Sequence, residues 1–202
     1  MKRVAEINRE TKETKIKVKI NLAGIGNYNI NTGIGFFDHM LEQLSKHSGI
    51  DIDLFARGDL HIDFHHTVED VGYTLGKAIS EALGDRKGIT RYGNAYVPMD
   101  ETLSRTVIDL SGRPYLVWHI FFTQNKLGDM DTELFKEWFQ AFSQALGANI
   151  HIENIYGVNN HHIIESCFKG IAISLKKAIK ISSTNNQQIP STKGKLINDS
   201  NK

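Results

Sequence analysis

The sequence repeats a pattern of segments, and this repetition constrains the fold more than any other feature. Adjacent histidines followed by a glutamate occur as DFHHTVED (63–70) and as NNHHIIES (159–166), at an offset of 96, which is 161 minus 65. A segment that ends in glycine precedes each pair, as FFDHMLEQLSKHSG (36–49) and LFKEWFQAFSQALG (134–147), at an offset of 98, which is 134 minus 36. Chance similarity could explain any one match, but several matches in the same order indicate an internal duplication.

Apolar periodicity within the copies predicts alternating strands and helices. The segment TKIKVKINL (14–22) alternates apolar and polar residues, as a half-buried strand does. The Glu13-Thr14 pair before it matches Glu101-Thr102 before a similar strand, at an offset of 88, which is 101 minus 13. The segment at 36–49 places apolar residues at helical spacing, with Gly49 as a C-terminal stop. The expected elements of the first copy are strands at 14–22, 50–58 and 59–64 and helices at 36–49 and 65–84.

The duplication predicts an α/β chain of the α+β, two-layer kind. Each half is expected to form a small, mainly antiparallel sheet covered by two helices, and the halves share a core. A chain of 202 residues is long enough to bury such a core. The expected division is a first half at 1–92, a second half at 93–182, and a flexible C-terminal tail at 183–202 that carries IPSTKG.

Charge, hydropathy and cysteine content exclude several classes of function. The chain has 24 basic and 23 acidic residues, a net charge of +1 that favours no nucleic acid and no membrane surface as partner. No apolar run approaches the roughly 18 residues of a membrane span. A single cysteine, Cys167, excludes an internal disulfide, and the first twenty residues lack the apolar core of a signal peptide. We therefore expect a cytoplasmic protein.

The paired histidines indicate metal chemistry. Neighbouring residues on a helix point about 100° apart, so His65 and His66 suit two ions, or one ion and a substrate, better than one ion between them. Imidazole and carboxylate ligands without thiolates favour Mn, Fe or Zn in a catalytic site. A single copy of the motif is more often a polar helix start, but the second copy reverses that weighting.

The repeat extends the set of candidate ligands, because His39 aligns with Glu137 at the offset of 98, which is 137 minus 39. A solvated glutamate on an amphipathic helix is the alternative for Glu137. Eight ligands would hold two ions and leave positions for substrate and water. The predicted ligands form two sets, which need not each serve one ion because halves or subunits can exchange ligands. The first set is His39, His65, His66 and Glu69, and the second is Glu137, His161, His162 and Glu165.

A second group of polar residues favours anion binding. Two arginines lie beside glycines in loops, where a guanidinium can present its fork to phosphate. The tail places three polar residues between Pro190 and Gly194, where backbone and side chains together could wrap a phosphate. Each residue taken alone is also an ordinary surface residue. The predicted phosphate-binding residues are Arg91, Arg113, Lys169, Ser191, Thr192 and Lys193.

Five segments together resemble the imidazoleglycerol-phosphate dehydratase family of histidine biosynthesis, from Glu13 to about Leu196. They are GFFDHMLEQLSKH, DFHHTVEDVGYTLGKA, DLSGRPYL, NNHHIIESCFK and IPSTKG. The resemblance implies a duplicated α/β fold of the ribosomal protein S5 domain 2-like kind. It also implies two Mn²⁺ ions per active site and a 24-subunit homo-oligomer built from trimers, with sites at subunit contacts. It also implies removal of water from imidazole glycerol phosphate, which gives imidazole acetol phosphate.

The resemblance also implies roles for single residues. Glu13 and Glu165 would move the protons, with the assignment of acid and base left open. Position 137 departs from the family, whose relatives carry a metal-binding histidine there, whereas this chain has Glu137 in KEWF. His151 ranks lower as a substitute ligand. The residues that would contact substrate are Glu13, Gln43, His47, Arg91, Arg113, Lys169, Ser191 and Lys193.

Two other classes of function remain open at this point. A dinuclear metallohydrolase acting on a small phosphorylated substrate would use similar ligands to form a metal-bound hydroxide. A metal-storage shell without enzymatic activity would need the histidine clusters but not the anion-binding loops.

Overall fold

A computed structural model describes residues 3–182 and 187–196; of the predicted tail, 183–186 and 197–202 lie outside the described residues. The first half contains β1 (Val4–Glu10), β2 (Thr14–Asn21), β3 (Tyr28–Asn31), α1 (Gly35–Ser48), β4 (Asp51–Gly58) and α2 (His65–Leu83). The second half contains β5 (Tyr92–Met99), β6 (Thr102–Asp109), β7 (Tyr115–His119), β8 (Lys126–Leu127), β9 (Met130–Asp131), α3 (Leu134–Leu146), β10 (Asn149–Tyr156) and α4 (Asn160–Ala178).

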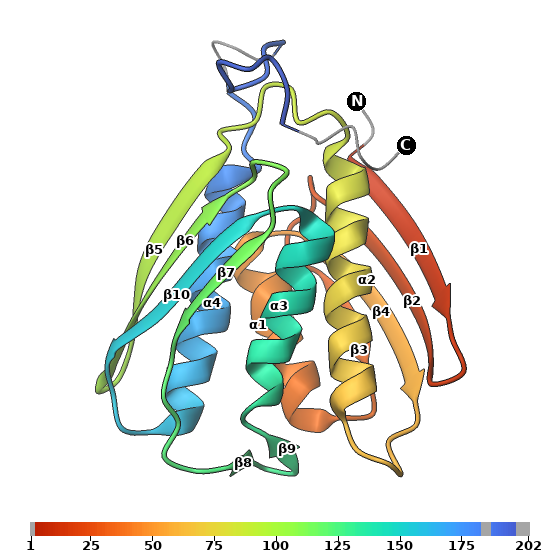
Figure 1. The fold of residues 1–202 in the computed structure, drawn as a ribbon, viewed down its shortest axis with the longest axis vertical. Coiled ribbons are helices and arrows are strands. Elements are labelled where there is room, and N and C mark those ends of the chain that lie inside the picture. The colour runs from red at the N-terminus through yellow and green to blue at the C-terminus, as the bar shows by residue number, and fades with distance from the viewer. Residues whose placement is uncertain (1–2, 183–186, 197–202) are drawn as a thin grey trace.

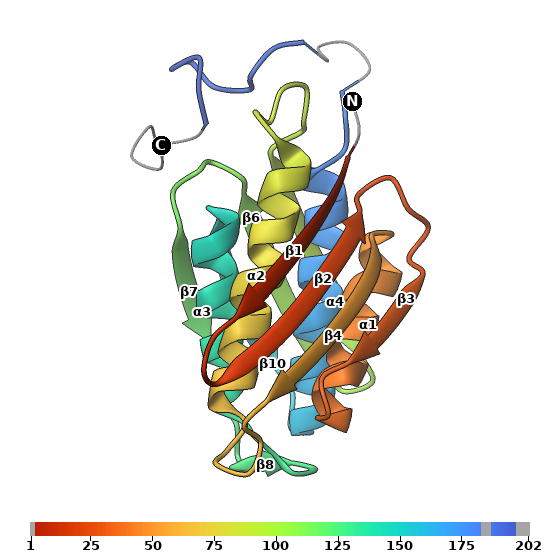
Figure 2. The ribbon, with the colours of Figure 1, turned by 90° about the vertical axis from the view of Figure 1, so that its right-hand side faces the viewer.

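The two halves form corresponding sheets with helices between them (Figure 1). The strand orders are β1-β2-β4-β3 and β5-β6-β10-β7, and in each sheet only the last strand runs parallel to its neighbour. Figure 2 shows the first sheet in front of the helices. Helix α2 packs against α3, and α1 packs against α4, so both halves contribute to one hydrophobic core. The predicted α+β fold class is confirmed, while the division into 1–92 and 93–182 stays a prediction.

Apolar patterning determines the elements as expected. In β2, Ile16, Val18 and Ile20 are buried, while the lysines between them face solvent. Helices α1 and α3 end at Gly49 and Gly147, which adopt φ values of 76° and 66°. Because a side chain strains this left-handed conformation, glycine is the natural helix terminator there. No helix in the described part of the chain has the length and hydropathy to span a membrane.

The prediction of a strand at 59–64 is wrong. The segment forms a turn, in which the Ile62 amide donates to the Asp59 carbonyl at 2.8 Å, and α2 begins directly after it. Strand β4 already pairs with β2 on one side and β3 on the other, so the sheet leaves no edge beside it for a further strand. Alternating hydropathy over six residues was therefore insufficient evidence for a strand. The edge strands β1 and β5 were not predicted.

Helix α4 lies unusually close to the second sheet. Glycine is required at position 93, because a Cβ there would lie 1.9 Å from the Ser174 carbonyl oxygen. Two buried hydroxyl pairs join the helix to β6, at 2.7 Å between Ser104 and Ser166 and at 2.8 Å between Thr106 and Ser174. Both pairs satisfy buried polar groups that would otherwise destabilise the interface.

A buried arginine connects the two halves at the end of α2. The Arg86 side chain donates hydrogen bonds to the carbonyls of Leu110 at 2.9 Å, Leu146 at 2.6 Å and Gly147 at 3.1 Å, and to the Ser80 hydroxyl at 3.2 Å. Leu146 and Gly147 end α3, where unpaired carbonyls and the helix dipole favour a cation. Burial lowers the pKa of Arg86 to about 10, so the guanidinium stays charged at neutral pH.

Candidate active site

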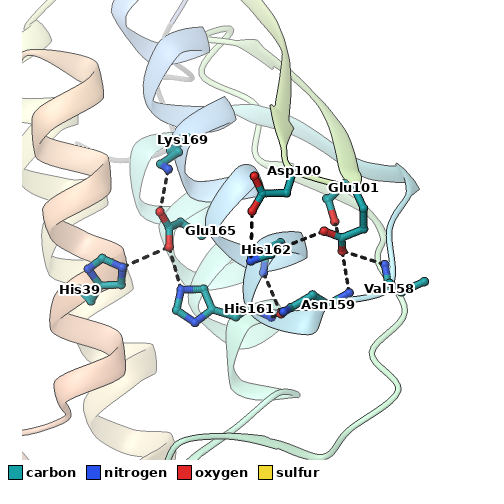
Figure 3. A network of polar contacts seen from close by, with 10 residues as sticks. His39, Asp100, Glu101, Val158, Asn159, His161, His162, Glu165 and Lys169 are labelled. Carbon is teal, nitrogen blue, oxygen red and sulfur yellow. Dashed lines mark hydrogen bonds and ion pairs between the residues drawn. The ribbon is translucent and has the colours of Figure 1, made fainter.

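Three potential metal ligands meet where α1 packs against α4. The Nε2 atoms of His39 and His161 lie 3.1 Å and 2.8 Å from one oxygen of Glu165, Oε2 (Figure 3). Ligand atoms of the three residues all lie within 4.8 Å of one another. The other oxygen of Glu165, Oε1, accepts from Lys169 Nζ at 2.7 Å. The packing of α1 against α4 thus brings His39 of the first half to His161 and Glu165 of the second half, whereas the sequence had placed His39 in a set with His65, His66 and Glu69.

The charges at this cluster suit a divalent cation. Burial opposes ionisation of the Glu165 side chain, which is 7% exposed, but hydrogen bonds from Lys169, His161 and His39 outweigh burial and lower its pKa to about 2. Burial, followed by the charge of Lys169, lowers the pKa of nearby His47. An ionised carboxylate beside two half-exposed imidazoles is a donor set that manganese, iron and zinc accept. The residues present therefore fit a metal ion.

The start of α2 presents a second set of predicted residues. His65 Nε2 lies 3.9 Å from Glu69 Oε2, one turn along the helix. The His66 ring bonds Asp59 through Nδ1 at 3.0 Å, and its Nε2 lies 3.9 Å from Glu13 Oε1. The hydrogen bond to Asp59 raises the pKa of His66. The two adjacent rings diverge, with centroids 6.2 Å apart and an interplanar angle of 86°.

The fourth predicted histidine of the paired motifs, His162, is held by a carboxylate from the turn between β5 and β6. Its Nδ1 lies 2.7 Å from Glu101 Oε2. The hydrogen bond from His162 and that from the Asn159 amide keep the pKa of Glu101 well below its usual range. His161 and His162 also diverge, with ring centroids 6.3 Å apart. Each histidine pair therefore points its rings at two different places, as predicted.

Five of the six predicted phosphate-binding residues, all except Lys169, line a pocket of about 320 Å³ at the other end of α4. Within it, the Arg91 guanidinium is paired with the Asp109 carboxylate at 2.7 Å and 3.0 Å and bonds the Pro190 carbonyl at 2.9 Å. Asp109 raises the pKa of Arg91 and keeps it charged. The pocket is lined by Arg91, Ser111, Arg113, Ser191, Thr192, Lys193, Lys195 and Leu196.

A single chain keeps the pocket and the metal-type cluster apart. The Arg91 amide bonds the carbonyl of Ala178, the last residue of α4. Glu165 precedes Ala178 by 13 residues, which is 178 minus 165, and this corresponds to about 20 Å of helix. The described residues of the tail, 187–196, likewise lie at the end of the molecule where α2 and α4 finish (Figure 1). Lys169 joins the Glu165 cluster rather than this pocket.

Three predicted residues have no place in the cluster within one chain. Glu137 lies half-buried in the first turn of α3 and is not part of the group around Glu165. Its proposed substitute, His151, is exposed on β10. Gln43 lies half-buried on α1, one turn beyond His39.

Sequence reasoning missed two carboxylates, Asp59 and Glu101, that form hydrogen bonds with predicted ligands. Asp59 lies in the segment wrongly predicted as a strand, so no role suggested itself. Glu101 was matched with Glu13 in the repeat but received no function. The repeat was the available signal for Glu101, because Glu13 and Glu101 each approach the second histidine of their own half.

Comparisons with known proteins give one family. The sequence model of the imidazoleglycerol-phosphate dehydratase family matches residues 32–175. An imidazoleglycerol-phosphate dehydratase of Zymomonas mobilis is 57% identical over 97% of this chain and 100% of its own length. Another, from Rhodopseudomonas palustris, is 57% identical over 96% of this chain and 98% of its own length.

Solved structures agree. The imidazoleglycerol-phosphate dehydratase of Staphylococcus aureus superimposes with a TM-score of 0.81 at 37% identity, over 89% of this chain and 99% of that one. The enzyme of Pyrococcus furiosus gives 0.81 at 36% identity, over 94% and 100%. The resemblance predicted from the sequence is confirmed. With its duplicated sheets, its paired histidine motifs and these relatives, the chain belongs to the imidazoleglycerol-phosphate dehydratase family.

Proposed function

We propose that this chain is a hydro-lyase of L-histidine biosynthesis, which removes water from D-erythro-imidazole glycerol phosphate and gives imidazole acetol phosphate. The observation that carries the proposal is the presence of two separate groups of side chains, the cluster of His39, His161 and Glu165 and the cationic pocket at Arg91 and Arg113. The first suits the imidazole end of such a substrate and the second suits its phosphate. Family membership supports the same reaction.

The proposed cofactor is Mn²⁺, with two ions per active site. When bound, the ions supply Lewis-acid stabilisation of the negative charge that develops on the substrate's imidazole ring. Nitrogen and carboxylate oxygen donors without thiolate fit this choice. The residues proposed to hold the ions are His39, His65, His66, Glu69, Glu137, His161, His162 and Glu165.

Carboxylates of the chain carry the protons in this proposal. The substrate must lose a proton from the carbon next to its ring, and its hydroxyl must gain one to leave as water. Glu13 is the better proton shuttle, since its side chain is 53% exposed and lies 3.9 Å from His66. Its carboxylate would accept the proton from the carbon, and the resulting carboxylic acid would return that proton to the leaving hydroxyl. Glu165 is tied to Lys169 and two imidazoles, which makes it a poor base and a good holder of positive charge.

The proposal includes a homo-oligomer, a 24-mer built from trimers, with active sites between subunits. About 20 Å of helix separates Glu165 from the Arg91 backbone, and the three-carbon backbone of the substrate is too short to reach both groups in one chain. A neighbouring subunit can bring the missing group close. Exposed aromatic side chains on the outer sheet faces, such as Phe55 and Tyr96, are typical of interfaces. A cytoplasmic location belongs to the same proposal and is supported by the single, buried cysteine.

The reaction can be tested directly. The purified chain, loaded with Mn²⁺, should convert imidazole glycerol phosphate to a product lighter by one water, with its phosphate ester intact. Mass spectrometry detects the product, and a phosphate assay on the same sample detects hydrolysis. Release of inorganic phosphate would favour the metallohydrolase instead. An intact assembly that binds metal but forms neither the dehydrated product nor inorganic phosphate would contradict both enzymatic functions and favour metal storage.

Replacement of Glu137 by alanine tests the position where this chain departs from its family. If Glu137 is a ligand, manganese content should fall by about one ion of the expected pair, because loss of a ligand weakens its site. Elemental analysis after dialysis measures the content. Glu133→Ala, in the turn before the same helix, is the control and should leave it unchanged. Equal manganese content in both variants would show that Glu137 is not a ligand.

A further inference from the structure

We propose that Glu101 and Asp59 are positioning residues that hold His162 and His66 in the tautomer with a proton on Nδ1 and a free lone pair on Nε2. The tautomers themselves are properties of the metal-free chain. Their use rests on the proposed function, in which these lone pairs face the metal ions. A positioning role would explain why each carboxylate contacts Nδ1 of its imidazole and leaves Nε2 as the nitrogen proposed to bind metal.

The contacts of Glu101 leave it only one role toward His162. Its Oε1 accepts from the Asn159 amide at 2.8 Å, the Val158 amide at 3.2 Å and the Thr102 hydroxyl at 3.0 Å. Its Oε2 lies 2.7 Å from His162 Nδ1 (Figure 3). An ionised carboxylate only accepts hydrogen bonds, so Nδ1 carries the proton and Nε2 of the neutral ring does not. Glu101 is thus fixed at one end and orients the imidazole with the other.

Asp59 performs the same task in the first half from a different segment. Its Oδ2 lies 3.0 Å from His66 Nδ1. The Asp59 side chain is 14% exposed, while the His66 ring is 34% exposed, so the bond lies on the protected side of the ring. The geometry again places the proton on Nδ1 and turns Nε2 away from Asp59, toward Glu13.

The repeat explains why two unrelated segments supply these carboxylates. Glu101 corresponds to Glu13 at the offset of 88, which is 101 minus 13. In the second half this glutamate bonds Nδ1 of the histidine, whereas in the first half Asp59 has taken that position. Glu13 is left facing Nε2 at 3.9 Å with half of its side chain exposed. Duplicated glutamates have therefore diverged, one to orient a ligand and one to remain free for proton transfer.

Orientation of this kind matters because a metal ion binds imidazole only through an unprotonated nitrogen. A carboxylate on the other ring nitrogen selects the tautomer, fixes the ring plane and makes the ligand more basic. Loss of such a partner typically lowers metal affinity about 10- to 100-fold.

The first test needs no variant of either carboxylate. Metal-free, full-length protein with ¹⁵N-labelled histidine is studied by solid-state NMR at pH 8.5, about two units above the ordinary histidine pKa. His162 and His66 should each show a protonated Nδ1 and an unprotonated Nε2; spectra of His162→Gln and His66→Gln assign the signals. A protonated Nε2 at both rings would overturn the proposal, whatever the activity of the enzyme.

The second test is Glu101→Gln. The amide oxygen must stay on the three donors at Oε1, since an amide nitrogen cannot accept them. The amide NH₂ then faces His162 Nδ1 and donates to it, which moves the ring proton to Nε2. We expect the NMR signals of His162 to show a protonated Nε2 and an unprotonated Nδ1. We also expect the dissociation constant for Mn²⁺ alone, measured by titration calorimetry, to rise about 10- to 100-fold.

Asp100→Asn is the matched control. Asp100 precedes Glu101 and lies 3.7 Å from His162 Nε2, with its side chain 80% exposed. It adopts a φ of 47°, which asparagine tolerates. This variant should keep the wild-type tautomer and affinity. Suppose that Glu101→Gln folds, as judged by circular dichroism and particle mass, yet keeps the wild-type tautomer of His162 and the wild-type Mn²⁺ affinity. The positioning role is then wrong. If the variant does not fold, the tautomers seen in the wild-type NMR spectra test the proposal by themselves.

Discussion

Replacement of Glu165 by glutamine is expected to reduce turnover by about 10³-fold, within the usual range for loss of an acid–base or charge-bearing group. Glu165 offers one oxygen to Lys169 and the other to His39 and His161. Glutamine is neutral and has one oxygen, so it cannot serve both sides. The turnover number with imidazole glycerol phosphate measures the effect. Retention of more than a tenth of the activity would contradict the role of Glu165.

Co-expression of two inactive variants tests whether each active site is shared between two subunits. Glu165→Gln and Arg113→Ala should each be inactive alone, but co-expression should restore up to about a quarter of the activity, because some sites then combine the intact Glu165 of one chain with the intact Arg113 of another. Co-expression of Glu165→Gln with His161→Ala should restore none, since both changes fall in one cluster. Equal behaviour of the two mixtures would contradict sites between subunits.

Replacement of Arg86 by methionine is expected to destabilise the fold by about 2–5 kcal/mol, because the buried carbonyls of Leu110 and Leu146 lose this donor at about 1–3 kcal/mol each and relaxation recovers part. Arg86→Lys should be intermediate, since one ammonium cannot reach acceptors arranged around a planar guanidinium. The φ of 60° at this position is equally strained with any of these side chains. Urea denaturation at fixed protein concentration measures the free energy of unfolding.

Arg57→Met provides the control for that measurement. Arg57 is exposed on β4, and exposed substitutions usually change stability by less than about 0.5 kcal/mol. A loss at Arg86 no larger than the loss at Arg57 would show that the buried hydrogen bonds at the end of α3 contribute nothing.

The sequence predicted most of the helical framework because helices carry their own periodicity. Three of the eight candidate ligands, His39, His161 and Glu165, meet in one chain, but in a grouping that joins the two predicted sets. The repeat also marked Glu137, by its alignment with His39, but alignment compares equivalent positions and does not show which of them meet. Contacts across the pseudo-symmetric halves, such as that between α1 and α4, follow from tertiary packing.

Single residues in turns and edge strands were harder to predict. Strand β1 is half-exposed along its length, and β5 contains Gly93 and Pro98. Neither sequence therefore shows the strong alternation of apolar and polar residues seen in β2. Asp59 and Glu101 are lone carboxylates whose partners lie 7 and 61 residues away in the chain. Their function depends on which ring nitrogen they reach, and no sequence pattern encodes that.

The close contact between α4 and the second sheet also sets a limit on motion. The hydroxyl pairs at Ser166 and Ser174 lie eight residues apart on the helix and hold it to β6 by hydrogen bonds at two points. Sliding by one helical turn, about 5.4 Å, would break both. His161 and Glu165 belong to this helix, so moving their backbone along the helix axis would break both contacts, and we expect adjustment to a ligand by rotation of their side chains instead. The packing of α4 on β6 therefore sets the position of His161 and Glu165 along the helix axis independently of any ligand.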